Sequence, residues 1–212
     1  MCHFKRRLNT TNKLTDMNNF KLILTTFLMT IVFFNNLFSQ SDTSLIRIGK
    51  EQYDAGKYKK ALQTYIKATE VNPNSALAYR LIGETYFRIL KLDESINALK
   101  KSIQIDSTDN KALMCLGIAQ ARQYTKTKDP SILAQSDSVY KKTISKNYEV
   151  PYVYMLMAYN NYYRKDYDKT WDYIFIVKKI DEKYLDMRFV VDLYSEHPDA
   201  NNVFNIKTTP NR

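Results

Sequence analysis

The sequence has little glycine, proline, cysteine or histidine. Its 212 residues include 4 Gly and 5 Pro, which disfavours a fold with many β-turns and favours a mostly helical one. Two cysteines, Cys2 and Cys115, allow at most one disulfide. Cys2 lies in a segment that we expect to be removed, so a disulfide framework is excluded. Cys115, in the apolar stretch ALMCLGIA with no histidine nearby, is expected to be a buried thiol rather than a nucleophile or ligand.

Motifs that mark enzymes are also missing. His197 is the single histidine after residue 40, no Cys/His spacing suits zinc, and nothing resembles a phosphate-binding loop or an acyl-transfer triad. The acidic neighbours Asp93-Glu94 and Asp181-Glu182 fall at expected helix ends, where capping and the helix dipole explain them. We therefore expect no enzymatic activity, no metal and no cofactor.

The N-terminal part contains one short hydrophobic run. Residues 22–38 are mostly apolar, Lys21 precedes them, and small polar residues follow. This order predicts a signal peptide within residues 1–40, and hence an exported protein that is periplasmic, envelope-associated or secreted. An uncleaved membrane anchor is the alternative, although the run is shorter than the roughly 20 residues of a spanning helix. Met17 is an alternative initiator, because MNNFKLILTTF is an ordinary signal-peptide start.

Net charge falls when this segment is removed. The whole chain carries +10, but five of its basic residues and one acid lie in residues 1–40, which leaves a net charge of +6. So mild a basic excess does not indicate nucleic-acid binding. Membrane contact is expected only through the signal segment or as weak peripheral contact.

An internal repeat organises the remainder. Gly49, Gly83 and Gly117 recur at a constant interval, and Ala158 takes the glycine's place after a longer interval, as it would after an insertion. Each period holds two helix-sized apolar patterns, and in the first two periods these cover residues 43–55, 58–71, 76–90 and 92–105. Small residues at regular places let paired helices approach closely, and large ones fill the space between pairs: Gly49, Ala61, Ala68, Gly83, Ser95 and Ser102, against Leu45, Tyr65, Tyr79, Tyr86 and Leu99.

The period and these landmarks resemble the tetratricopeptide repeat (TPR), a helix–turn–helix unit of about 34 residues. The matching residues are Ile48-Gly49, Gly56, Tyr58, Ala61, Tyr65, Ala68 and Pro73, then Ile82-Gly83, Tyr86 and Ile96, then Leu116-Gly117, and finally Met157-Ala158 with DYDKTWDYI. The resemblance implies an all-α solenoid of about four helix pairs over residues 42–181. A C-terminal capping helix is expected over 182–198 and a mobile tail over 199–212.

The third unit departs from the pattern. Its first helix is expected to end near Tyr124, which leaves the loop TKTKD where a tight turn is usual. Asp129-Pro130 then predicts the start of the next helix, with Asp as N-cap and Pro as first residue. The longer loop is either a tolerated insertion or a place of contact.

In TPR proteins the first helix of each pair lines a concave groove that usually binds peptides or protein segments. Mapping this position onto the chain gives ten candidate groove residues: Lys50, Tyr53, Arg80, Glu84, Phe87, Arg88, Met114, Arg122, Tyr159 and Tyr163. Aromatic and arginine side chains dominate binding hot spots, so the groove suits an extended, partly acidic segment. The other interpretation is that the tyrosines pack between repeats and the arginines are solvated or ion-paired. A clamp for chaperone tails is not supported, because Ile46 and Lys50 occupy the places where it needs Lys and Asn.

The functional prediction is an exported TPR scaffold that mediates protein–protein interaction through its concave groove, in the cell envelope or outside the cell. The alternative is a surface-associated protein that binds anionic lipid or cell-wall polymer through a basic convex face. Pairs of lysines on the second helices motivate this alternative: Lys59-Lys60, Lys100-Lys101, Lys141-Lys142 and Lys178-Lys179.

Overall fold

The computed structural model describes residues 24–30, 42–199 and 204. Within these ranges the chain is all-α and has no strand. A helix over residues 42–54 is followed by α2 (Tyr58–Val71), α3 (Ala76–Arg88), α4 (Leu92–Ile105), α5 (Asn110–Thr127), α6 (Pro130–Ser145), α7 (Val150–Tyr163), α8 (Tyr167–Asp181), the 3₁₀ turn η1 (Glu182–Tyr184) and α9 (Met187–Glu196). Most of the predicted signal segment and of the predicted tail lies outside the described residues.

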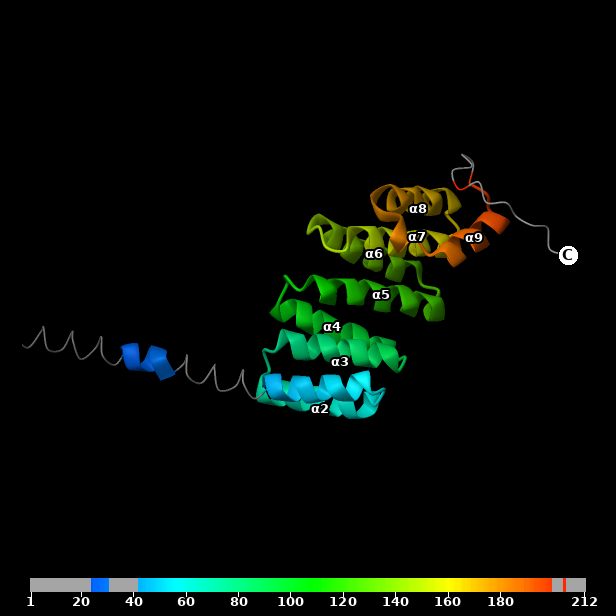
Figure 1. Cartoon of the computed structure of the whole chain (residues 1–212). Coiled ribbons are helices and arrows are strands. Elements are labelled where there is room, and N and C mark those ends of the chain that lie inside the picture. The colour runs from blue at the N-terminus through cyan, green and yellow to red at the C-terminus, as the bar shows by residue number, and fades with distance from the viewer. Residues whose placement is uncertain (1–23, 31–41, 200–203, 205–212) are drawn as a thin grey trace, which may run out of the picture.

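Successive helices form four antiparallel pairs that stack into a solenoid. Each helix packs against its neighbours in the sequence, so the pairs lie one after another from α2 at one end to α8 and α9 at the other (Figure 1). In the part of the chain that the structure describes, the four pairs and the terminal helix α9 are those that the repeat predicts. The predicted all-α TPR solenoid is therefore confirmed.

Close approach within each pair depends on a small residue that faces a large one. A Cβ atom at Gly83 would lie 2.6 Å from Leu99 Cγ, and one at Gly117 only 2.3 Å from Tyr140 Cε1. Since real side chains do not approach so closely, these positions cannot carry a larger residue without a shift of the partner. In the fourth pair Ala158 replaces the glycine, and Ile174, which is smaller than tyrosine, lies with it in one core cluster.

Serine hydroxyl groups form hydrogen bonds between the helices of the same pairs. Ser95 Oγ donates to the Gly83 carbonyl at 2.8 Å, and Ser136 Oγ donates to the Gly117 carbonyl at 2.9 Å. Both serine side chains are fully buried. The helices can approach so closely because serine is small and its buried hydroxyl is satisfied by a backbone oxygen.

The insertion in the third unit lengthens helices instead of forming a loop. Helix α5 continues to Thr127, three residues beyond the expected end at Tyr124, and only Lys128 and Asp129 separate it from α6. Lys128 adopts the left-handed conformation that ends α5, and Asp129 caps α6 by accepting from Ser131 N. The expectation of a longer loop was wrong, because this compact turn lets the inserted residues continue both helices.

The C-terminal helix covers the end of the array. Asp186 is its N-cap, so α9 begins at Met187 rather than directly after α8, with η1 in between. Val190 and Leu193 are buried against α7 and α8, in the core cluster that holds Trp171. The outer face exposes Arg188, Asp192 and Glu196, as expected of a cap, but also Met187 and Val191.

Candidate functional site

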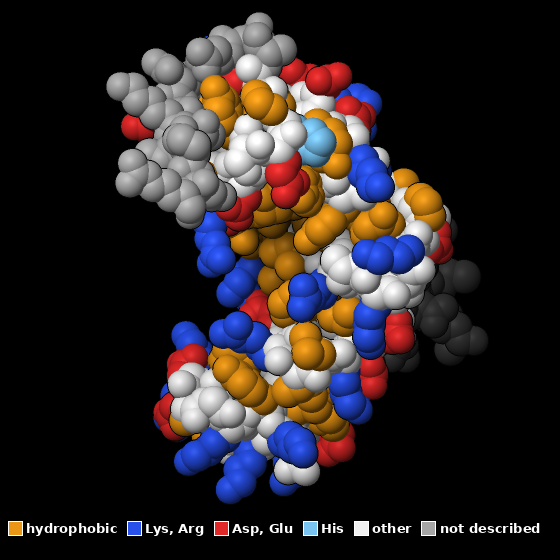
Figure 2. All heavy atoms as spheres, turned by 90° about the vertical axis from the view of Figure 1, so that its right-hand side faces the viewer, with side chains coloured by type: hydrophobic (Ala, Val, Ile, Leu, Met, Phe, Trp, Pro, Cys, Tyr) orange, Lys and Arg blue, Asp and Glu red, His pale blue; other side chains and the backbone are white. Residues whose placement is uncertain are grey.

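A groove runs along the first helices of the pairs and contains two adjoining pockets. The first pocket, of about 230 Å³, is lined by Tyr53, Glu84, Phe87, Arg88, Leu99, Lys111, Cys115 and Ile118. The second pocket, of about 190 Å³, is lined by Phe87, Ile118, Ala121, Arg122, Tyr140, Leu156, Tyr159, Asn160 and Tyr163. Because Phe87 and Ile118 line both, the pockets form one continuous surface. Figure 2 shows a hollow on one side of the molecule, with hydrophobic side chains on its floor and Lys and Arg side chains along its edge.

Seven of the ten predicted groove residues line these pockets. They are Tyr53, Glu84, Phe87, Arg88, Arg122, Tyr159 and Tyr163. Lys50 is exposed on the first helix but lines neither pocket. The remaining two, Arg80 and Met114, are held by contacts within the protein.

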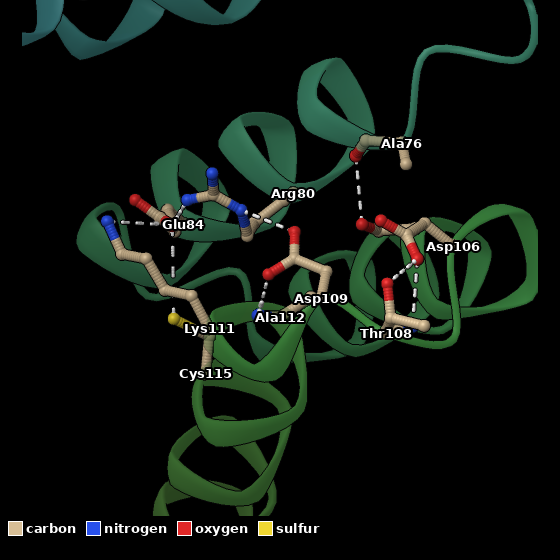
Figure 3. Close-up of polar contacts among 10 residues, drawn as sticks. Ala76, Arg80, Glu84, Asp106, Thr108, Asp109, Lys111, Ala112 and Cys115 are labelled. Atoms are coloured by element: carbon tan, nitrogen blue, oxygen red, sulfur yellow. Dashed lines mark hydrogen bonds and ion pairs between the residues drawn. The ribbon is translucent and has the colours of Figure 1, made fainter. Parts of the chain in front are cut away.

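Arg80 belongs to an ion-pair cluster between the second and third pairs. Its Nη1 lies 2.7 Å from Glu84 Oε1, and its Nε donates to Asp109 Oδ2 at 2.8 Å (Figure 3). Asp109 also caps α5 by accepting from Ala112 N. Burial acts to lower the pKa of Arg80, but the two carboxylates outweigh it and raise that pKa. Arg80 therefore joins α3 to the start of α5.

Met114 packs between repeats. Its side chain is half-buried against the core cluster of Tyr140, Val153 and Met157. This is a structural contact between α5 and its neighbours, and it leaves little of the side chain for a partner.

The two predicted tyrosines of α7 differ in how much they are held. The Tyr159 ring packs against Phe189 at an interplanar angle of 46° with ring centroids 4.5 Å apart, and its hydroxyl donates to Asp186 Oδ2. Burial, followed by this hydrogen bond, raises the pKa of Tyr159. Tyr163 is 38% exposed, and its ring touches those of Tyr124 and Tyr162. Tyr163 is thus the more available of the two.

Positive charge in the pockets is not balanced by carboxylates. Glu84 is the single acid among the lining residues, and it is already paired with Arg80 at 2.7 Å and lies 3.6 Å from Lys111. Arg88 and Arg122 are exposed, and neither has an ion pair with any residue that the structure describes. Hydrogen bonding to the phenol oxygen of Tyr53 is the main cause that raises the pKa of Arg88. Both guanidinium groups therefore remain available to an anion.

Sequence reasoning left Lys111, Cys115, Leu156 and Asn160 out of the candidate set. Cys115 and Leu156 lie one helical turn before Ile118 and Tyr159, so the helical period could have found them. Burial raises the pKa of the Cys115 thiol to about 12, and the thiol donates to Glu84 Oε1 at 3.9 Å. A thiol with this pKa stays protonated near neutral pH and acts as a pocket wall rather than a nucleophile.

Only two of the four lysine pairs of the second helices line up, namely Lys100-Lys101 and Lys141-Lys142, which directly follow the equivalent residues Leu99 and Tyr140. Lys59-Lys60 lie in the first turn of α2, whereas Lys178-Lys179 lie in the last turn of α8. Since α2, α4, α6 and α8 are equivalent helices of the stack, pairs at different turns lie at different heights. They do not form a continuous basic stripe across the array.

Two further properties bear on the kind of site. Among the described residues, no group of three or more His, Cys, Asp or Glu side chains could hold a metal ion. In the same part of the chain, no helix combines the length and hydrophobicity needed to cross a membrane.

The sequence was compared with family models and with known proteins. Residues 49–89 match the model of the TPR repeat. A search of the curated protein sequences finds no significant match. The matched residues lie in the first two units, where the resemblance is strongest in the sequence.

Solved structures of TPR proteins share this architecture. A thermophilic TPR protein of Thermus thermophilus superposes with a TM-score of 0.62 at 18% identity, covering 74% of this chain and 84% of that one. MamA gives a TM-score of 0.58 at 22% identity, with 67% of this chain and 79% of that one covered. YrrB, described as a TPR protein with an unusual peptide-binding site, gives 0.57 at 15% identity and covers 76% of this chain and 80% of its own. At these identities the likeness establishes the fold.

Proposed function

We propose that this chain, which matches the TPR repeat over residues 49–89 and folds as TPR proteins do, binds an extended segment of another protein in its concave groove, as expected of a non-enzymatic scaffold for protein–protein interaction. The observation that carries this proposal is the pair of adjoining apolar pockets, joined through Phe87 and Ile118. Aromatic and aliphatic walls can bury the side chains of a segment, and Arg88 and Arg122 can meet its acidic groups.

Our proposal places this function in the cell envelope or outside the cell. The support for this location is the hydrophobic run of residues 22–38. A basic residue, Lys21, directly precedes the run, as in a signal peptide. The described part of that run is helical over residues 24–30, and its large apolar side chains are exposed, Met29 by 76% and Phe27 by 62%. The described residues 24–30 thus add nothing to the core, as expected of a segment that is removed.

Binding of anionic lipid or polymer by the convex face is the competing function. The lysine pairs favour it, since all of these lysines except Lys178 are exposed, but only two of the four pairs share a height on the helices, which weakens it. Salt separates the two, because lysine-driven adhesion falls steeply between about 0.05 and 0.5 M salt, while a contact with a buried apolar floor is retained better.

Photo-crosslinking in cells that produce the full chain tests the groove directly. A photo-reactive amino acid is placed at Tyr163 in the groove or at Ile66 on α2, which have nearly the same exposure, 38% and 37%. We expect a defined protein adduct from position 163 that weakens with Arg88→Glu plus Arg122→Glu, and none from position 66. Equal adducts at both positions would remove the support for the groove, and a salt-sensitive adduct at position 66 alone would favour the convex face.

A further inference from the structure

The two pockets of the groove are the same site, repeated one unit apart. Seven of the eight residues that line the first pocket have their repeat equivalents in the second. Equivalent residues that do not span the insertion are separated by the Gly83–Gly117 interval. Equivalent residues that span it are separated by the longer Gly117–Ala158 interval. In order, Tyr53, Glu84, Phe87, Arg88, Leu99, Cys115 and Ile118 of the first pocket correspond to Phe87, Ile118, Ala121, Arg122, Tyr140, Leu156 and Tyr159 of the second.

What is retained between the pockets is an arginine beside an apolar wall. Arg88 and Arg122 are equivalent, exposed and without an ion pair in the described residues. The deep wall is a buried side chain that also faces a glycine of the paired helix, namely Leu99 or Tyr140. The wall on the next first helix is Cys115 or Leu156. Each pocket thus offers an apolar cavity with one arginine at its edge, while Lys111 of the first pocket lies 3.6 Å from Glu84.

The separation of the pockets follows from the helix packing. Helices α3 and α5 touch, as do α5 and α7, and helices in contact have axes about 8–10 Å apart. One repeat along the groove is therefore about 10 Å. In a β-strand the side chains on one face recur every second residue, at about 7 or 13 Å, which misses this spacing. In polyproline II conformation they recur every third residue, at about 9 Å.

We propose that the groove takes an acidic segment in polyproline II conformation, in which an apolar residue with an adjacent carboxylate recurs every third position. One apolar side chain enters each pocket, and the carboxylates pair with Arg88 and Arg122. The inference rests on the proposed groove binding and adds the chemistry and spacing of the partner. An acidic partner is preferred to a basic one, because the single carboxylate lining the pockets, Glu84, is already paired with Arg80 and lies 3.6 Å from Lys111.

Fluorescence anisotropy of labelled peptides with the full chain tests the spacing and the charge separately. The reference probe is (Leu-Glu-Pro)₄. Its controls are (Leu-Lys-Pro)₄, which reverses the charge, (Ser-Glu-Pro)₄, which removes the apolar side chains, and (Leu-Glu-Pro-Pro)₃, which changes the period to four. We expect the reference probe to bind about tenfold or more tightly than each control. We also expect Arg88→Glu and Arg122→Glu each to weaken it about three- to tenfold. Lys101→Glu on α4 should leave the affinity unchanged.

The outcomes distinguish this inference from the proposed function. Equal binding of the period-four or lysine probe, lost on Phe87→Ala, overturns the spacing or charge and leaves groove binding intact. Binding of the reference probe that neither arginine variant alters overturns the inference as well. If no probe binds in a manner sensitive to Phe87→Ala, while the photo-reactive residue at position 163 captures no partner, both proposals fall. Circular dichroism of each variant, compared with the wild type, ensures that lost binding does not reflect unfolding.

Discussion

Tyr159 connects the groove to the terminal helix. Its ring packs on Phe189 of α9, and its hydroxyl donates to Asp186, the residue that also caps α9 by accepting from Phe189 N. The hydrogen bond from Tyr159 is the main cause that lowers the pKa of Asp186. A residue placed on the concave face by its repeat position is thus also part of the cap.

Replacing Tyr159 by Phe is expected to destabilise the protein by about 1 kcal/mol near pH 6, since a hydrogen bond to an exposed carboxylate is at the low end of its range. The folded-state pKa of Asp186 lies below the unfolded value of about 3.9, so the stabilisation is complete above that value. It is lost as pH falls through the folded pKa. Urea unfolding at pH 6 and pH 2.5 should therefore show a smaller difference between variant and wild type at the lower pH.

Tyr163→Phe is the matched control for this pair of measurements. Tyr163 lies on the same helix and lines the same pocket, but no hydrogen bond joins its hydroxyl to a carboxylate among the described residues. Its variant should unfold like the wild type at both pH values. A pH-independent loss in Tyr159→Phe would mean that ring packing, rather than the bond to Asp186, is the source of the effect.

At the residue scale, the repeat predicts on which face a side chain lies but not which other residues it contacts. It placed Arg80 on the concave face, yet it gave no sign that Asp109 would hold the Nε atom at 2.8 Å. That contact depends on the rotamers of two side chains from different pairs, 29 residues apart in the sequence. Met114 shows the same limit, because its long flexible side chain turns into the core of the next pair.

Each helix pair has one close contact that sets the separation of its helices, and the fourth pair shows how it can be altered. The first three pairs place Gly opposite Tyr65, Leu99 or Tyr140, whereas the fourth has Ala158 with Ile174. Compared with the Gly–Tyr pairs, Ala158 adds a methyl group and Ile174 has a smaller side chain than tyrosine, so the two changes in volume offset each other. Close packing therefore couples the two positions within a pair.

Gly117→Ala is expected to cost about 1 kcal/mol net. The added Cβ lies 2.3 Å from the buried Tyr140 ring, and such overpacking costs about 1–3 kcal/mol, against about 1 kcal/mol gained in helix propensity. Adding Tyr140→Ile reproduces the arrangement of the fourth pair and should recover stability. In a double-mutant cycle from urea unfolding, the double variant should be more stable than the sum of the singles by about 1 kcal/mol. Additive effects would show that the two positions are not coupled.

At the element scale, most helices could be predicted from the sequence and the insertion could not. Apolar periodicity placed α2 and α4 at the observed residues, because Pro73 and the spacing of small residues mark their limits. The inserted residues carry no apolar pattern, so they were expected to form a loop. In the structure they extend α5 and α6. The residues just before the α5 extension bond to both neighbouring pairs, Gln123 to Asp93 and Tyr124 to the Tyr163 carbonyl.

For the whole molecule, the linear stack determines how far a disturbance spreads. Contacts run between adjacent helices and between successive first helices, so each pair depends mainly on its neighbours. The number of pairs follows from the repeat period, and the face that forms the groove is what the TPR resemblance implies. The unequal availability of the groove residues does not follow from the period, because it is set by the cap at one end and by the ion pairs between the second and third pairs.

Loss of the cap should loosen one end of the array and leave the other intact. Leu193 of α9 is 1% exposed in the core cluster with Trp171 and Ile174, so Leu193→Ala is expected to cost about 2–5 kcal/mol locally. Amide hydrogen exchange should accelerate strongly in α7, α8 and α9, while α3 and α4 keep their protection, because coupling in a linear stack falls with distance. Val191→Ala, on the same helix but 42% exposed, is the matched control and should change little. An equal loss of protection in α3 and α9 would contradict this argument, since it would mean that the four pairs and their cap unfold as a single cooperative unit.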